Sequence, residues 1–205
     1  METHHINEHH VEFDPDTHSY FVDGKKVPSV TQIIEAIHPR KTSKADPDVL
    51  KKAAERGNQL RSMIKAYESE DVKTYHPEMH GYLALKTQHQ IHVLNSDVIV
   101  LLHQHGIVIG AGRFNMVVQS PFIKGRGIAD VKRRLHLDEG RLLLQLNLYK
   151  LAYEQTYKQK IRYLKCMHIR NRYHRYVDIP VHKQEAQALL DKYTEKHPID
   201  YQAWF

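Results

Sequence analysis

Asp130 and Lys132 stand two positions apart in the short apolar run Ile128-Ala129-Asp130-Val131 and its continuation. Residues i and i+2 of a β-strand point to the same face, so a carboxylate and an ammonium group would stand side by side at the end of a strand. Such a pair can hold a divalent metal ion and orient an attacking water. The backbone carbonyl of Val131 between them would add a further oxygen ligand.

Asn115 decides how well that site can hold a metal. It lies in the run 111–118, which has the pattern of a second strand. A metal site would need another carboxylate at this place, and the chain supplies an amide. Because a hard cation such as Mg²⁺ prefers carboxylates, the neutral carbonyl oxygen of Asn115 is a poor replacement.

Two further segments complete a pattern with these two strands. In chain order the four pieces are Arg56-Gly57-Asn58-Gln59-Leu60-Arg61, Ala111-Gly112-Arg113-Phe114-Asn115, Ala129-Asp130-Val131-Lys132 and Gln145-Leu146-Asn147-Leu148-Tyr149. Their order, spacing and element types resemble the PD-(D/E)XK nuclease superfamily, in particular its RecB-type branch in phage recombination and DNA processing. The resemblance spans residues 56 to 149. It implies that Asp130 and Lys132 are catalytic, that Gln145 and Tyr149 line the DNA path, and that the cofactor is Mg²⁺ or Mn²⁺.

The chain departs from the family pattern at two positions. Arg61 stands where the family has a histidine, and Asn115 stands where it has an aspartate. Arginine is always protonated and cannot coordinate a cation. Asp130 and the Val131 carbonyl are then the only ligands left, so we expect weak metal binding or none. We expect Arg61 to replace the metal's charge by pairing with Asp130 or with a DNA phosphate.

The charge of the chain suits a polyanionic partner. It has 30 Lys and Arg residues against 24 Asp and Glu, a formal net charge of +6. An ordinary basic surface would give the same excess, but cations cluster around the expected site. Arg133, Arg134 and Arg141 are therefore expected to contact DNA beside Gln145 and Tyr149.

Composition indicates one compact domain over residues 1–205. No run of eighteen apolar residues exists, so we expect no membrane-spanning helix. The single cysteine, Cys166, excludes an internal disulfide and reads as an inert thiol in a core strand. A reducing setting, the cytoplasm of a bacterial host cell, is expected.

The pattern of elements predicts an α/β fold, which the resemblance makes a restriction-endonuclease-like mixed sheet flanked by helices. We expect an N-terminal β-meander and short helix within 1–40, a nuclease-like core over 46–180, and a C-terminal helix and aromatic tail over 183–205. Core strands are expected over 97–102, 107–118, 127–133, 161–169 and 173–179. Helices are expected from 46, from 77 toward 92, over 138–158 and over 183–196. Val49 and Leu50 should belong to the buried face of the first long helix, and Gly57 should mark a close packing contact in it.

Three functions remain open. The first is a DNA-binding protein of the nuclease fold with impaired or lost metal-dependent hydrolysis. The second is an active Mg²⁺- or Mn²⁺-dependent exonuclease or endonuclease of phage recombination, which would recruit another ligand such as Glu55, Glu78 or Asp97. The third is an interaction or inhibitor module with a protein partner in phage or host DNA metabolism.

Overall fold

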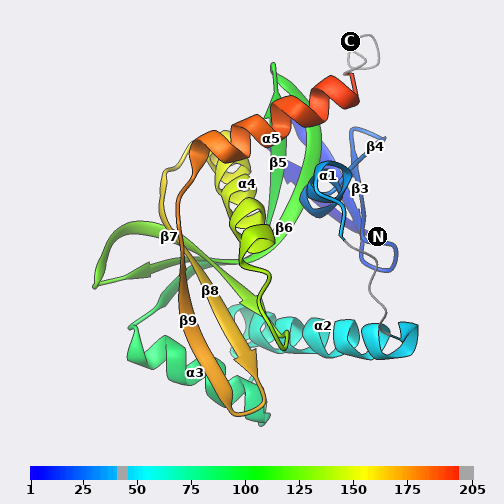
Figure 1. Ribbon diagram of the computed structural model, residues 1–205. Coiled ribbons are helices and arrows are strands. Elements are labelled where there is room, and N and C mark those ends of the chain that lie inside the picture. The colour runs from blue at the N-terminus through cyan, green and yellow to red at the C-terminus, as the bar shows by residue number, and fades with distance from the viewer. Residues whose placement is uncertain (41–45, 199–205) are drawn as a thin grey trace.

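A computed structural model describes residues 1–40 and 46–198 of the chain. Strands and helices both contribute to the fold, as the α/β prediction requires (Figure 1). In chain order they are β1 (Glu2–Ile6), β2 (His9–Asp14), β3 (Ser19–Val22), β4 (Lys25–Val27), α1 (Val30–Ile37), α2 (Pro47–Glu70), α3 (Pro77–Gln88), β5 (His92–Gln104), β6 (Ile107–Ser120), β7 (Ile123–Lys132), α4 (Glu139–Tyr157), β8 (Ile161–Arg170), β9 (Tyr173–Ile179) and α5 (Lys183–Lys196).

The strands form two sheets. The first has the order β1-β2-β3-β4 and is antiparallel throughout. The second has the order β5-β6-β7-β8-β9, and its strands are antiparallel except for the parallel pair β7 and β8. Because parallel neighbours need a long crossover connection, α4 runs between them. The α/β class with a mixed sheet is therefore confirmed.

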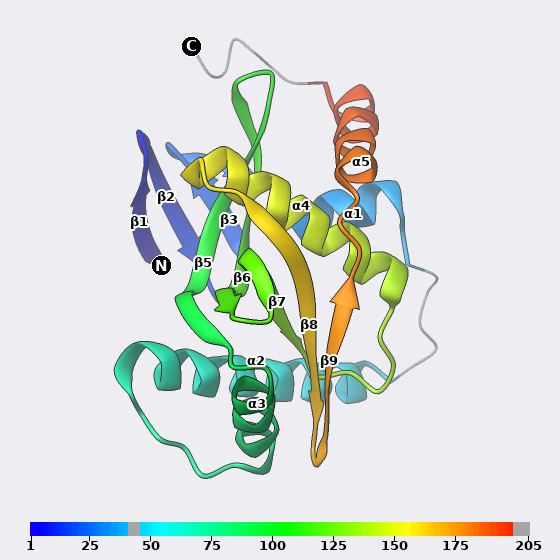
Figure 2. The same cartoon turned by 90° about the vertical axis from the view of Figure 1, so that its left-hand side faces the viewer.

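Helices cover both faces of the five-stranded sheet. Helices α1, α4 and α5 share one apolar core with it, and α2 and α3 share another. Figure 1 shows α4 and α5 above the sheet and α2 and α3 below it, and Figure 2 shows the same layers from the side. On β7, Ile128 faces the α4 layer, whereas Ala129 and Val131 face the α2–α3 layer. Strand alternation then directs Asp130 and Lys132 toward α4.

The N-terminal sheet packs on the distal part of the β5–β6 hairpin. Apolar residues of both, among them Phe13, Tyr20 and Leu101, form a common buried cluster. The backbone amide of Ala111 also donates to the carbonyl of Pro28 at 3.0 Å. These contacts fix the position of α1, which follows directly, over β6 and α4.

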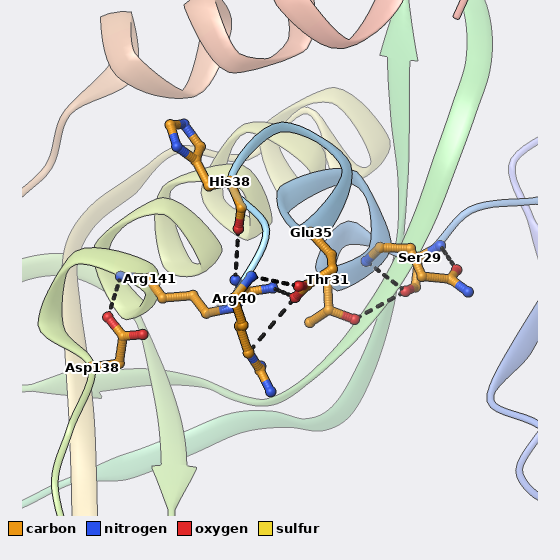
Figure 3. Close-up of polar contacts among 8 residues, drawn as sticks. Ser29, Thr31, Glu35, His38, Arg40, Asp138 and Arg141 are labelled. Atoms are coloured by element: carbon orange, nitrogen blue, oxygen red, sulfur yellow. Dashed lines mark hydrogen bonds and ion pairs between the residues drawn. The ribbon is translucent and has the colours of Figure 1, made fainter. Parts of the chain in front are cut away.

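Side-chain caps fix the starts of the helices that border the site. Ser29 caps α1 in a capping box with Gln32, in which each side chain accepts from the other residue's backbone amide. Asp138 caps α4 by accepting from the backbone amide of Arg141 at 3.0 Å. Both caps appear in Figure 3.

The observed bounds differ from the expected ones in a few places. Strand β5 begins five residues before 97, and β1 was not foreseen. The first turns of α2 project beyond the sheet (Figure 1), and Val49 and Leu50 are 59% and 49% exposed, so their expected burial is wrong. The expected aromatic tail ending at Phe205 lies outside the described residues. Among the helices described, none is long and apolar enough to cross a membrane.

Candidate functional site

Asp130 and Lys132 form an ion pair on the α4 side of β7. Lys132 Nζ lies 2.7 Å from Asp130 Oδ2, which confirms the expected side-by-side arrangement. Asp130 is only 1% exposed, and within the described chain neither of its carboxylate oxygens accepts a hydrogen bond. A buried carboxylate without hydrogen-bond donors is costly. The charge of Lys132 is therefore the main compensation for Asp130.

Asn115 lies where β6 and β7 separate. Their ladder reaches Met116 opposite Ala129. The next backbone amide of β7 that turns toward β6, that of Val131, donates to Asn115 Oδ1 at 2.9 Å. The amide oxygen thus replaces a missing strand partner, and Asn115 is 5% exposed. Asn115 is thus a structural link between two strands.

The residues present do not fit a catalytic divalent metal. Mg²⁺ keeps several water molecules when a protein binds it, and it takes one or two carboxylates. The oxygens of Asp130 have no appreciable contact with solvent, and the oxygen of Asn115 is engaged with Val131. Across residues 1–40 and 46–198, no group of three or more His, Cys, Asp or Glu side chains could hold a metal ion. The Val131 carbonyl and Asp130 alone make a poor site.

The acidic residues considered as replacement ligands are occupied or distant. Glu78 forms an ion pair with Arg133. Asp97 receives two hydrogen bonds from Arg113 and lies 2.6 Å from Lys65 Nζ. Glu55 is exposed on the projecting part of α2. None of them joins Asp130, so the structure gives no support to a recruited metal ligand.

Arg61 does not pair with Asp130, contrary to expectation. In the described part of the chain its half-buried guanidinium has no ion pair or hydrogen bond, because Lys132 already pairs with Asp130. Its charge instead acts on His18 of the N-terminal segment. Burial, and then the charges of Arg61 and Arg113, lowers the pKa of His18. Sequence patterns gave no sign that His18, from the meander, would lie near α2.

Tyr149 and Gln145 lie together on α4, as their i, i+4 spacing predicts. Gln145 Nε2 donates to Tyr149 Oη at 3.3 Å. Tyr149 is 5% exposed, and its ring packs against Phe114 with the centroids 5.4 Å apart. Burial, and then the charge of Asp130, raises the pKa of Tyr149 to about 12. A ring this buried is not available to stack on a base, so Tyr149 supports the site from beneath.

Arg133 lies on the opposite face from Gln145, so its expected place beside the α4 residues is wrong. Its Nε lies 2.7 Å and 2.8 Å from the two carboxylate oxygens of Glu78 on α3. Glu78 also accepts from the backbone amide of Asn171 at 2.9 Å. Because Glu78 is buried, Arg133 serves to neutralise it and to tie β7 to α3.

Arg134 and Arg141 do lie near Gln145, around a small space that we call the cationic cavity. The cavity has a volume of about 190 Å³ and lies between α1, the end of β7 and the start of α4. Its polar lining consists of Thr31, Arg40, Lys132, Arg134, Asp138, Arg141 and Gln145. Sequence reasoning missed Arg40 and Thr31, which come from about ninety residues earlier in the chain and carry no motif.

Contacts with α1 hold two of these arginines in place. Arg141 donates to Glu35 Oε2 and, at 3.1 Å, to the carbonyl of His38. The backbone amide of Arg40 donates to Glu35 Oε1 at 2.7 Å, and its Nε lies 3.6 Å from Glu35 Oε2. Figure 3 shows both arginines converging on Glu35. The hydrogen bond from the Arg40 backbone, opposed by burial and helped by the Arg141 charge, lowers the pKa of Glu35.

Cys166 lies opposite Asp130 on the neighbouring strand β8. It is fully buried. Burial, and then the charge of Asp130, raises the pKa of its thiol to about 12. The thiol therefore stays protonated near neutral pH, as expected for an inert core cysteine.

Comparisons with known proteins supply neither a family nor a function for this chain. No family model matches the chain, and no curated protein matches it. Among solved structures, the crystal structure of SSO0001 is similar with a TM-score of 0.36 and 12% sequence identity, over 82% of this chain and 84% of that chain. A likeness this distant carries no argument about activity, so the function has to be argued from the site.

Proposed function

We propose that this protein binds DNA at the face formed by the end of β7 and the start of α4, and that it does not hydrolyse the bound strand efficiently. The observation that carries the proposal is the buried ion pair of Asp130 and Lys132 beside the cationic cavity, with an amide in place of a second carboxylate. The resemblance of its motifs to RecB-type nucleases supplies DNA as the class of partner and phage DNA metabolism as the setting.

Electrostatics support the binding half of the proposal. Arg40 follows α1, Lys132 and Arg134 lie at and just after the end of β7, and Arg141 lies in the first turn of α4. All four line one cavity. Arginine presents a planar fork of donors that matches a phosphate, and clustered cations release counterions from DNA on binding. The lining includes the carboxylate of Asp138, which already caps α4. Asp130 pairs with Lys132, and Glu35 pairs with Arg40 and Arg141. Among the described residues, four cations therefore face three carboxylates, and a polyanion would meet one positive charge in excess.

The chemistry of the donor set supports the second half. Hydrolysis in this class of enzyme depends on a metal ion that activates water and stabilises developing charge. Asp130 is sealed from solvent, and Asn115 uses its oxygen within the sheet. The ammonium of Lys132 is committed to Asp130. The protein would thus keep a face that attracts phosphate and lack the groups that cleave it.

A labelled-DNA experiment tests both halves. A fluorescein-labelled duplex and single strand are titrated with the protein in EDTA, in Mg²⁺ and in Mn²⁺, and the label is then resolved on a denaturing gel. We expect similar binding in all three conditions and an intact label. Metal-dependent cleavage that Asp130→Ala abolishes would contradict the proposal and favour an active nuclease.

A second candidate function, a protein-interaction module, is favoured by the projecting part of α2. Its first turns extend past the sheet (Figure 1), and Val49 and Leu50 are exposed there. Exposed apolar residues on an otherwise unsupported helix suit a protein partner. If the protein fails to bind DNA at low salt and Leu50→Glu abolishes capture of a defined partner from host DNA metabolism, this function replaces the first.

A further inference from the structure

The cationic cavity contains a guanidinium that the fold does not neutralise. Lys132 is paired with Asp130, and Arg40 and Arg141 share Glu35. Arg134 differs from these three. In the part of the chain that the structure describes, its side chain has no hydrogen bond and no ion pair, and the residue is exposed to solvent where it lines the cavity.

The surroundings of Arg134 make this isolation unfavourable. Burial, and then the charge of Arg40, lowers the pKa of Arg134. The charge of Asp138 acts in the opposite sense, and that of Arg141 lowers the pKa again. Arg134 is thus held among three further cations that line the same cavity, and no carboxylate among the described residues forms an ion pair with it. An anionic ligand in the cavity would supply the missing negative charge.

The size of the cavity limits that ligand. A water molecule occupies about 30 Å³ in the liquid, so about 190 Å³ corresponds to roughly six waters. A phosphate group has five heavy atoms and fits with part of its hydration shell, whereas a nucleoside is too large. Around the phosphate, the hydroxyl of Thr31 and the amide of Gln145 would supply neutral donors.

We propose that the cationic cavity is a binding site for a phosphate group, with Arg134 as its bidentate ligand. Arg40, Lys132 and Arg141 supply further positive charge. The inference rests on the proposed function in one respect, because it makes the phosphate of a DNA strand the physiological occupant. Inorganic phosphate shares this chemistry and can be measured without DNA.

The first experiment is calorimetric titration with inorganic phosphate in a chloride buffer. The wild type should bind one phosphate per chain, Arg134→Gln should bind at least tenfold more weakly, and Arg134→Lys should fall between them. Arg162→Gln is the matched control, since Arg162 is exposed at the start of β8, remote from the cavity lining. It removes the same charge and should leave phosphate affinity within twofold of the wild type.

Thermal unfolding without phosphate shows that the variant is folded. Because Arg134 has no partner among the described residues, Arg134→Gln should melt at or above the temperature of the wild type. Phosphate should then raise the melting temperature of the wild type and of Arg162→Gln, and not that of Arg134→Gln. Absence of phosphate binding by the wild type, or equal weakening by the two glutamine variants, overturns the inference.

Oligonucleotides separate this inference from the proposed function. Strands with a 5′ phosphate, a 3′ phosphate or no terminal phosphate are compared in the wild type and Arg134→Gln. Weaker binding of every strand to Arg134→Gln assigns the site to internal phosphates, and a loss confined to one phosphorylated end assigns it to that end. Phosphate binding that needs Arg134, without DNA binding, leaves the site standing and removes the proposed function. DNA binding that Arg134→Gln leaves unchanged supports the proposed function and contradicts the phosphate site at Arg134.

Discussion

The side-chain oxygen of Asn115 accepts a hydrogen bond from the backbone amide of Val131 at 2.9 Å, so one amide joins β6 to β7 at the point where their ladder ends. Val131 directly follows Asp130 in the chain. An aspartate at 115 could accept the same hydrogen bond, and it would also bring a second carboxylate beside Asp130. An amide at position 115 therefore keeps the strand contact and adds no second carboxylate beside Asp130.

The double change Asn115→Asp with Arg61→His should create metal affinity. Without metal, the new carboxylate repels Asp130, and we expect a loss of about 1–3 kcal/mol in the free energy of unfolding. Mn²⁺ should bind and restore the melting temperature, as measured by calorimetry and thermal unfolding.

Asn147→Asp is the control for this change. Asn147 is also buried, and its Oδ1 accepts from the backbone amide of His182 at 2.7 Å. It should lose stability and gain no Mn²⁺ response. If the double variant binds Mn²⁺ no better than the control does, the inferred relation between positions 115 and 130 is wrong.

The pair formed by Glu78 and Arg133 should contribute to stability and not to DNA binding. Glu78→Gln leaves a largely buried guanidinium unpaired and should cost about 3 kcal/mol. In a double-mutant cycle with Arg133→Gln, the coupling should be about 1.5–3 kcal/mol. Chemical denaturation measures it. Two results would place Arg133 with the α4 residues. One is a strictly additive loss of stability in the cycle. The other is a salt dependence of DNA binding that Arg133→Gln reduces as much as Arg134→Gln does.

The contact between Gly112 and Tyr149 should not tolerate a methyl group. A Cβ at position 112 would lie 2.7 Å from Tyr149 Cε1 and 2.9 Å from Val30 Cγ2. Gly112→Ala should therefore destabilise the protein by about 1–3 kcal/mol in denaturant unfolding. Gly57→Ala is the matched control, since nothing lies within 4 Å of its Cβ position. It should stabilise α2 by about 0.5–1 kcal/mol, and a loss there would show that Gly57 does pack closely.

Asp97 should make stability depend on acid pH. Burial opposes its ionisation, but hydrogen bonds from Arg113 and Lys65 outweigh burial and lower the pKa of Asp97 below its ordinary 3.8. A group with a lowered folded-state pKa stabilises the fold above its unfolded pKa, and the contribution is lost as pH falls through the folded value. Asp97→Asn should cost about 2 kcal/mol at neutral pH.

The difference in unfolding free energy between the wild type and Asp97→Asn should shrink below about pH 4. The Asp97 carboxyl then becomes protonated and, like the asparagine of the variant, carries no charge. Urea unfolding of both proteins between pH 2 and 8 measures this convergence. A difference that stays constant across that range would mean that the ion pair is not its cause.

Local patterns predicted the elements and one pair of side chains. Period-two alternation located β7 and put Asp130 and Lys132 on one face. The helix expected over 138–158 corresponds to α4, and Asp138 is its N-cap. Strand β1 was missed because Glu2-Thr3-His4-His5 has no apolar alternation, and its partner β2 is what makes it a strand.

Long-range partners of charged residues were not predictable from the sequence. Arg133 and Arg134 are neighbours in the chain, yet one pairs with Glu78 on α3 and the other faces the cationic cavity. Both arginines follow the end of β7, where strand alternation no longer fixes the direction of a side chain. The place of Arg40 depends on how α1 packs against α4, which no local pattern encodes. The prediction that Val49 and Leu50 are buried was wrong for the same reason, because the first turns of α2 extend beyond the sheet on which the helix packs.

The central claim is that the face around the cationic cavity binds DNA without a metal. The most direct test is fluorescence anisotropy of a labelled duplex in EDTA, titrated at several salt concentrations. Log affinity should fall linearly with log salt, with a slope of roughly −0.9 per phosphate contact. Arg134→Gln should flatten the slope by about one unit, and Arg133→Gln should leave it unchanged. No binding at about 50 mM salt, or binding and cleavage that both require Mn²⁺, would contradict the account.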